Sequence, residues 1–81
     1  MDNMQATFSV STMSIASTAL MAMGLAPNQD NKTEVDKTMA RFNIDMLVML
    51  REKTKNRLNA DEENLLNHII QDLQHKFLQL K

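Results

Sequence analysis

The stretch that decides the fold runs from Thr33 to Asn56 and reads TEVDKTMARFNIDMLVMLREKTKN. Apolar residues recur in it every three or four positions, which is typical of one face of a helix. This first stripe comprises Val35, Met39, Phe42, Met46, Met49 and Leu50. A second stripe lies roughly opposite in helical projection and comprises Ala40, Ile44, Leu47 and Val48. A helix that is apolar on two sides needs two contact surfaces.

Polar residues and capping signals complete this helix. Arg41, Asp45 and Glu52 form a narrow polar strip between the stripes, and Arg41 and Asp45, one turn apart, are expected to pair. Thr33, with an acidic residue three positions later, is a variant of the capping box and predicts the N-cap. Asn56 tolerates the left-handed backbone that ends many helices. The pattern therefore predicts a helix over about 34–55.

A second helix is predicted over about 60–80. Asn59 is a good N-cap, and acidic residues occupy the first turn, where the helix dipole favours them. One face is apolar and comprises Leu66, Ile69, Ile70, Leu73, Phe77 and Leu80. Because only a few residues connect it to the helix before, the two must lie antiparallel as an αα-hairpin.

The N-terminal part predicts a further helix over about 7–23. Gly24 suits the C′ position and Pro27 stands shortly after it, so residues 24–33 read as a loop. The run from Asn3 to Gln29 carries no charge and is long enough to cross a bilayer. However, its hydroxyl side chains gather on one stripe, which favours a packing helix over a membrane span. That stripe comprises Thr7, Ser11, Ser14 and Thr18.

These patterns together predict an all-α fold in one helical domain over 1–81. Helices 34–55 and 60–80 form the antiparallel hairpin, and helix 7–23 packs on it or on a partner chain. The 81 residues include no cysteine, so neither disulfides nor thiolate metal sites are available. The formal net charge of −1 gives no general attraction to nucleic acid or to an acidic membrane.

No group of residues predicts catalysis or a cofactor. His68, Asp72 and His75 share a helical face, but the two imidazoles would lie about 10 Å apart along the axis, too far to chelate one ion. A solvated polar face is the favoured interpretation. Motifs for nucleophiles, phosphate loops and metal-bound water are absent from the sequence. We therefore expect neither an enzyme nor a metal protein.

A basic cluster closes the central helix and comprises Arg51, Lys53, Lys55 and Arg57. It could contact an anion, an acidic partner or nucleic acid. Glu52 interrupts it, acids follow it, and no aromatic side chain is interleaved for base stacking. Because charges of this sign also complement the helix dipole, nucleic-acid binding remains only an alternative function.

The favoured function is a non-catalytic protein–protein interaction module, either a homo-oligomer or a small accessory subunit of a larger complex. Eight methionines either fill the core or provide a surface that repacks against a partner, and both interpretations stay open. Membrane association through helix 7–23 is a further alternative. The predicted interface comprises Met13, Ala16, Leu20, Met23, Met39, Phe42, Ile44, Met46, Leu47, Val48 and Met49.

Two motifs resemble a known family. Pro27-Asn28 and the run IDMLVMLREKTKNRL, residues 44–58, are similar to small bacterial proteins catalogued as a domain of unknown function, number 1844. Asn56-Arg57 stands where that family usually has Gly-Asn, and Gln74-His75-Lys76 replaces a more arginine-rich ending. Gly24, the acidic pair and the leucines of the last helix also match, namely Glu62, Glu63, Leu66 and Leu73. The resemblance implies a cytoplasmic bacterial helical protein without an established activity.

Overall fold

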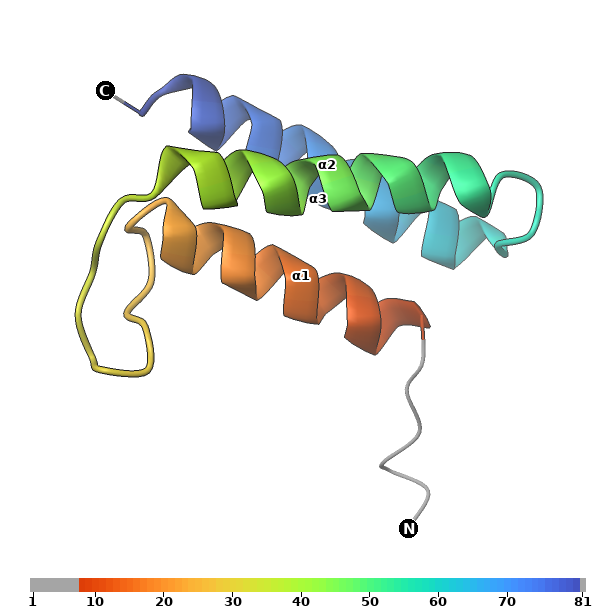
Figure 1. The fold of residues 1–81 in the computed structure, drawn as a ribbon. Coiled ribbons are helices and arrows are strands. Elements are labelled where there is room, and N and C mark those ends of the chain that lie inside the picture. The colour runs from red at the N-terminus through yellow and green to blue at the C-terminus, as the bar shows by residue number, and fades with distance from the viewer. Residues whose placement is uncertain (1–7, 81) are drawn as a thin grey trace, which may run out of the picture.

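The computed structural model describes residues 8–80, and they form three helices (Figure 1). These are α1 (Phe8–Ala22), α2 (Lys37–Lys53) and α3 (Ala60–Leu78). Each helix packs against the other two, and α1 and α2 share the most extensive contact. The predicted all-α architecture is confirmed, and α1 packs on the hairpin of its own chain.

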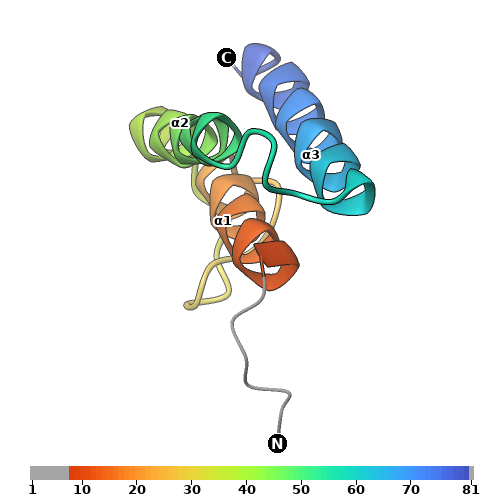
Figure 2. The same cartoon turned by 90° about the vertical axis from the view of Figure 1, so that its right-hand side faces the viewer.

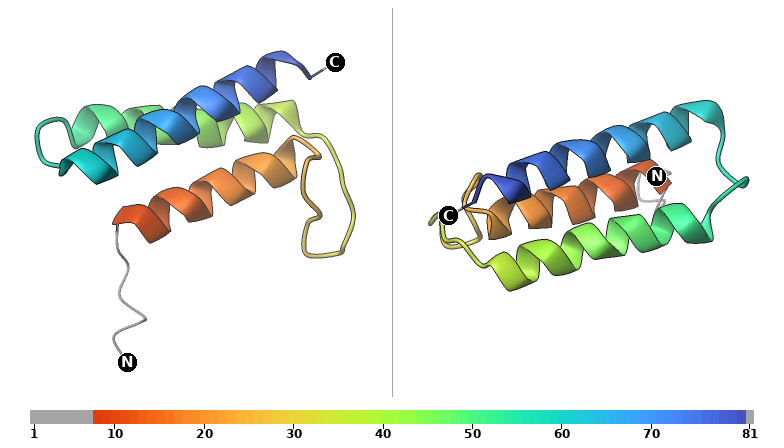
Figure 3. Two further views of the ribbon diagram at one scale, coloured as in Figure 1. Left: turned by 180° about the vertical axis from the view of Figure 1, so that it is seen from behind. Right: turned by 90° about the horizontal axis from the view of Figure 1, so that it is seen from above.

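The chain runs up, down and up again through the three helices. Seen from above, α2 lies antiparallel to α1 and α3 (Figure 3). In an end view the helices occupy the corners of a triangle, with α1 and α3 on different sides of α2 (Figure 2). This arrangement confirms the antiparallel hairpin of α2 and α3. It leaves the side of α2 that faces away from both neighbours open to solvent.

Small side chains set the close contact between α1 and α2. Ala19 of α1 and Ala40 of α2 are fully buried. Because alanine has a small side chain, it allows the backbones of α1 and α2 to approach closely at this point. The larger side chains of the core lie around these alanines. The buried apolar residues are Ala16, Ala19, Ala22, Met23, Ala40, Ile44, Leu47, Leu66, Ile70 and Leu73.

The hydroxyl stripe of α1 lies on its exposed side, as the sequence predicts, and Val10 and Met13 are exposed there as well. Ser11, Ser14 and Thr18 are exposed, whereas Thr7 lies outside the described residues. Helix α1 ends in a Schellman motif, in which the Gly24 amide donates to the Met21 carbonyl and the Leu25 amide to the Leu20 carbonyl. Gly24 has φ +73°, the left-handed conformation expected at C′.

The loop between α1 and α2 is closed at its base and braced inside. Met23 and Val35 form an isolated antiparallel bridge, and the Asp36 amide donates to the Ala22 carbonyl at 2.7 Å. Inside the loop, Asn28 Oδ1 accepts from the amides of Asp30 and Lys32 at 2.9 and 3.1 Å. These bonds hold the start of α2 against the end of α1.

The predicted N-cap of the central helix is wrong. Asp36, not Thr33, caps α2, and its carboxylate accepts from the Met39 amide at 3.0 Å. The helix begins at Lys37, three positions later than expected, because Val35 is extended in the bridge to Met23. The helix ends at Lys53, and the Thr54 hydroxyl donates to the Leu50 carbonyl.

The turn into α3 follows the sequence signals. Asn56 has φ +68°, so its expected left-handed conformation is confirmed, although it lies beyond the last helical residue of α2. Asn59 is the N-cap of α3, as predicted. Its side chain accepts from the Glu62 amide at 2.8 Å, and the Glu62 carboxylate accepts from the Asn59 amide at 3.1 Å, which completes a capping box. Helix α3 ends at Leu78.

Candidate functional site

The two apolar stripes of α2 have different surroundings. Ala40, Ile44 and Leu47 of the second stripe are buried, and Val48 is half-buried against the same core. Helices α1 and α3 together cover this stripe. The chain therefore satisfies one apolar side of α2 by itself.

The first stripe faces solvent. Leu50 is half-buried and belongs with the core, so we define the α2 seam as Val35, Met39, Phe42, Met46 and Met49. Met46 is half-buried, and the other four side chains keep about half their surface exposed: Val35 58%, Met39 45%, Phe42 56% and Met49 50%. A run of large apolar side chains along a helix, open to water, marks a contact surface that the chain itself leaves uncovered.

The spacing within the α2 seam is that of a coiled-coil seam. Its four members within α2, from Met39 to Met49, follow one another at intervals of three, four and three residues, and Val35 lies just before the N-cap. This alternation averages 3.5 residues and keeps one narrow stripe facing a neighbouring helix. The seam therefore suits another helix lying along α2 better than a compact ligand.

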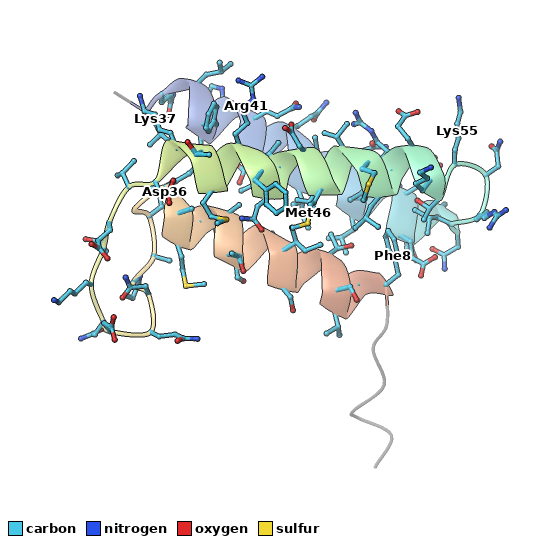
Figure 4. All side chains as sticks on the ribbon, in the orientation of Figure 1. Phe8, Asp36, Lys37, Arg41, Met46 and Lys55 are labelled. Atoms are coloured by element: carbon cyan, nitrogen blue, oxygen red, sulfur yellow. The ribbon has the colours of Figure 1, made fainter. Side chains whose placement is uncertain are left out.

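Charge is confined to the other flank of the exposed side. Arg41 points away from α1, whereas Met46 points toward it (Figure 4). Lys37, Arg41, Asp45 and Glu52 are exposed, and the expected ion pair between Arg41 and Asp45 is wrong, since no salt bridge joins them in the described chain. An exposed pair with the base N-terminal to the acid gains little from this spacing.

The flank of the α2 seam next to α1 carries no charge. Thr18 and Met21 of α1 line one hollow together with Met39, which shows that the seam and α1 share a surface. No residue of α1 is charged. A helix lying on the α2 seam would meet the small hydroxyl side chains of α1 along most of its length. It would meet the carboxylates of Asp30, Glu34 and Asp36 at the hollow before the N-terminal end of α2.

The other predicted interface residues lie elsewhere in the fold. Ala16, Met23, Ile44 and Leu47 belong to the core of the chain and are not available to a partner in this folded form. Met13 and Leu20 point to a different surface, between α1 and α3. The structure thus brings together Met39, Phe42, Met46 and Met49 and separates them from the remaining predicted residues.

An open groove between α1 and α3 is a feature that sequence reasoning missed. It has a volume of about 530 Å³, and Leu65 and Ile69 of α3 face Met13 and Leu20 of α1 across it. Leu65 stands beside the predicted apolar face of α3, and this extra leucine was the available signal. The polar members of the rim are Asn64, His68 and Asp72.

The basic cluster is split by the fold. Arg51 is half-buried, and its guanidinium Nη1 donates to Asn67 Oδ1 of α3 at 3.4 Å. Lys53, Lys55 and Arg57 are exposed. Three basic side chains, rather than four, are therefore free to meet an external group at this end of α2.

The histidine face carries local contacts. Asp72 accepts from the Lys76 ammonium at 2.6 and 2.7 Å, and His75 Nε2 lies 3.3 Å from Gln79 Nε2. Within the described residues no three His, Cys, Asp or Glu side chains gather closely enough to hold a metal ion. These side chains form an exposed helix surface.

One buried side-chain hydroxyl in the described chain makes no hydrogen bond. Thr12 of α1 is fully buried, and its hydroxyl has no hydrogen-bond partner. A single hydroxyl enclosed by apolar side chains lowers stability, and it offers neither a charge nor a second group for chemistry. Thr12 is therefore a packing residue.

Comparison with known proteins supports the resemblance seen in the motifs. Residues 5–79 match the family described as "Domain of unknown function (DUF1844)". The chain belongs to this family. No curated protein and no solved structure matches it. Among the described residues, none of the helices has the length and apolar character needed to cross a membrane.

The Pro27-Asn28 pair, part of the resemblance to the family, has a structural role in this DUF1844 member. Asn28, in the Pro27-Asn28 pair, organises the loop between α1 and α2 through its side chain. Its Nδ2 also donates to Glu34 Oε1 at 3.0 Å, and Glu34 lies in the part of the loop that leads into α2. The motif thus serves the placement of α1 on α2, while the α2 seam remains exposed beside it.

Proposed function

We propose that this DUF1844 chain is a non-catalytic protein–protein interaction module whose contact surface is the α2 seam. The heptad spacing of Met39, Phe42, Met46 and Met49 on the solvent-facing side of α2 is the observation that carries the proposal. The module acts by placing α2 beside a helix of its partner. It belongs to a homo-oligomer or serves as a small accessory subunit.

The energetics favour a partner for this surface. Full burial of one large apolar side chain contributes about 1.5–3 kcal/mol relative to leaving it in water. Phe42 lies at the middle of the α2 seam, where an aromatic anchor is most useful in an interface. The methionines on either side adapt their shape to a partner because their side chains are unbranched and flexible.

The arrangement of ionisable groups also supports a binding role. Most of the acids, bases and histidines considered for chemistry are exposed on the surface of the chain, and the half-buried Arg51 and the exposed Asp72 are engaged with neighbours in their own chain. A catalytic site needs such groups held together in a water-excluding pocket. We further place the module in the bacterial cytoplasm, on the family resemblance alone.

Site-specific photocrosslinking tests the proposal. A benzophenone amino acid replaces Phe42 in the tagged full chain, and the matched control carries the same group in place of Gln71, which is exposed on α3. After irradiation of the native cells, a discrete protein adduct at position 42 and none at position 71 is expected. Equal, diffuse labelling at both positions would contradict a specific contact surface on α2.

The basic end of α2 gives the nucleic-acid alternative weaker support. Lys53, Lys55 and Arg57 remain exposed, but Arg51 is held by Asn67. Three phosphate contacts give a shallow salt dependence and weak binding. Titration of RNA and DNA at two salt concentrations, with charge reversal of the three residues, measures this alternative directly.

A further inference from the structure

We infer that the partner of the α2 seam is a second copy of this chain, paired antiparallel across a two-fold axis level with Ile44. The inference rests on the proposed function and names the occupant of its surface. It follows from the register of the seam, from the charges at the ends of α2 and from a hollow at one of those ends.

The register of the α2 seam is self-complementary. When two copies of α2 run antiparallel about the level of Ile44, Met39 meets Met49 of the other copy. In the same pairing Phe42 meets Met46 of the other copy, so the four seam residues that lie within α2 pair with one another. The central layers bring methionine sulfur to an aromatic ring, a favourable contact. The pairing covers about 15 Å of axis, from Met39 to Met49, both of which lie within α2.

The end of each α2 reaches past the paired region. Lys53, the last residue of α2, lies one heptad step beyond Met46 and extends toward Val35, in the loop before α2 of the other copy. Its aliphatic stem can cover the valine while its ammonium reaches the solvent-exposed acids beside it. Lys53 is exposed and takes part in no ion pair among the described residues.

Charge selects the antiparallel orientation over the parallel one. Lys53, Lys55 and Arg57 gather at the C-terminal end of α2, and Asp36 and Lys55 mark its opposite ends (Figure 4). Asp30, Glu34 and Asp36 gather at the N-terminal end. An antiparallel pair places the basic end of each copy at the acidic end of the other, whereas a parallel pair would place basic on basic.

A hollow lies where these basic side chains would arrive. Its volume is about 460 Å³, and its lining includes Asp30, Glu34, Asp36 and Met39. Met39 belongs to the α2 seam, so the hollow adjoins the N-terminal end of the seam and extends toward the loop before α2. Lys32 and Lys37 at this end, and Glu52 among the basic side chains at the other, are also exposed and moderate the attraction. The seam therefore supplies the affinity, and the charges select the orientation.

The two-fold pairing accounts for both sides of α2. Each copy covers Ala40, Ile44 and Leu47 with its own α1 and α3, and covers its α2 seam with the seam of its partner. An isologous contact uses the same surface on both copies, so it closes at the dimer and leaves no seam free for further growth.

Solution mass tests whether the chain pairs through the α2 seam. Light scattering on the full chain over a wide concentration range is expected to give twice the 9.3 kDa chain mass. The Phe42→Asp variant should lose the dimer and keep its helical circular dichroism, because Phe42 is exposed in the single chain. The control is Gln71→Asp, an exposed side chain on α3, which should remain dimeric. A dimer that survives Phe42→Asp would overturn the inference.

Cysteine crosslinking tests the orientation, since the natural chain contains no cysteine. The Met39→Cys/Met49→Cys double variant should form an intermolecular disulfide under mild oxidation. Neither single variant should do so, because in an antiparallel pair two copies of position 39 lie about 15 Å apart along the axis and a disulfide needs α-carbons within about 7 Å. Rapid crosslinking of the single variants would indicate a parallel pair and overturn the antiparallel register.

The outcomes separate this inference from the proposed function. A monomer at every concentration, together with a photocrosslink from position 42 to a different protein, would contradict the pairing of two copies and support the proposed interaction module. A monomer with no adduct from position 42 would contradict both. A dimer whose crosslinks follow the expected register supports both.

Discussion

Gly24 and Val35 lie so close that a β-carbon on the glycine would stand 2.9 Å from Cγ2 of the valine. The same glycine has φ +73°, which other residues adopt only at a cost. Val35 forms the bridge with Met23, the residue just before Gly24, and this bridge joins the end of α1 to the start of α2. This contact sets how α1 meets α2.

Gly24→Ala is therefore expected to lower the free energy of unfolding by about 1–2 kcal/mol, because the added methyl group strains the backbone and displaces Val35. Urea denaturation followed by circular dichroism measures the change. Asn31→Ala is the matched control, since Asn31 also has positive φ, at 60°, and alanine there meets only the left-handed backbone, so the loss should be smaller. Equal loss in both variants would show that left-handed backbone, and not the contact with Val35, is responsible.

A second prediction concerns Asn28, whose side chain takes part in three hydrogen bonds within the loop. Asn28→Ala removes all three and is expected to cost about 1–3 kcal/mol, each exposed bond being at the low end of the usual range. Asn28→Asp keeps the acceptor for two amides but faces Glu34, so it should fall between the natural chain and the alanine variant.

Thermal unfolding of these variants provides the measurement, and Gln29→Ala is the control. Gln29 is exposed, and substitution of such a surface residue usually changes stability by less than about 0.5 kcal/mol. If Asn28→Ala unfolded at the same temperature as Gln29→Ala, the Pro27-Asn28 motif would have no structural role in this loop.

The loop also shows where sequence reasoning reached its limit. Thr33 and Asp36 both satisfy the local rules for an N-cap, and only the long-range bridge between Met23 and Val35 decides between them. The caps at Gly24 and Asn59 depend on residues within a few positions, so their signals sufficed. Local chemistry thus predicted the helix ends that no distant contact overrides.

The candidate site was predictable in part for the same reason. Periodicity alone identified both stripes of α2 and placed Phe42 and Met46 together. It could not tell which stripe the chain would cover, because that choice depends on Ala19 and Ala40 allowing α1 to approach one side closely. The groove between α1 and α3 depends on the placement of two helices that are distant in sequence, and no local pattern reports it.

Close contact between α1 and α2 leads to a third prediction. Ala19→Leu inserts a large side chain where the natural residue is fully buried, and such overpacking is expected to cost about 1–3 kcal/mol. Ser14→Leu introduces the same side chain on the exposed face of α1 and should leave the unfolding midpoint nearly unchanged. Chemical denaturation of both variants compares them. Similar midpoints would show that the helices can separate without loss.

The last prediction concerns Thr12, whose hydroxyl is fully buried without a hydrogen-bond partner. Leaving such a group unsatisfied costs about 1–3 kcal/mol. Thr12→Val keeps the shape and removes the hydroxyl, so it is expected to raise the free energy of unfolding by about 1 kcal/mol. Thr12→Ser is the control, because it keeps the hydroxyl, removes a buried methyl group and should destabilise. Denaturation midpoints report both changes. Loss of stability in the valine variant would mean that the hydroxyl gains a bond in solution, which a donor rotated toward the carbonyl one turn earlier in α1 would provide.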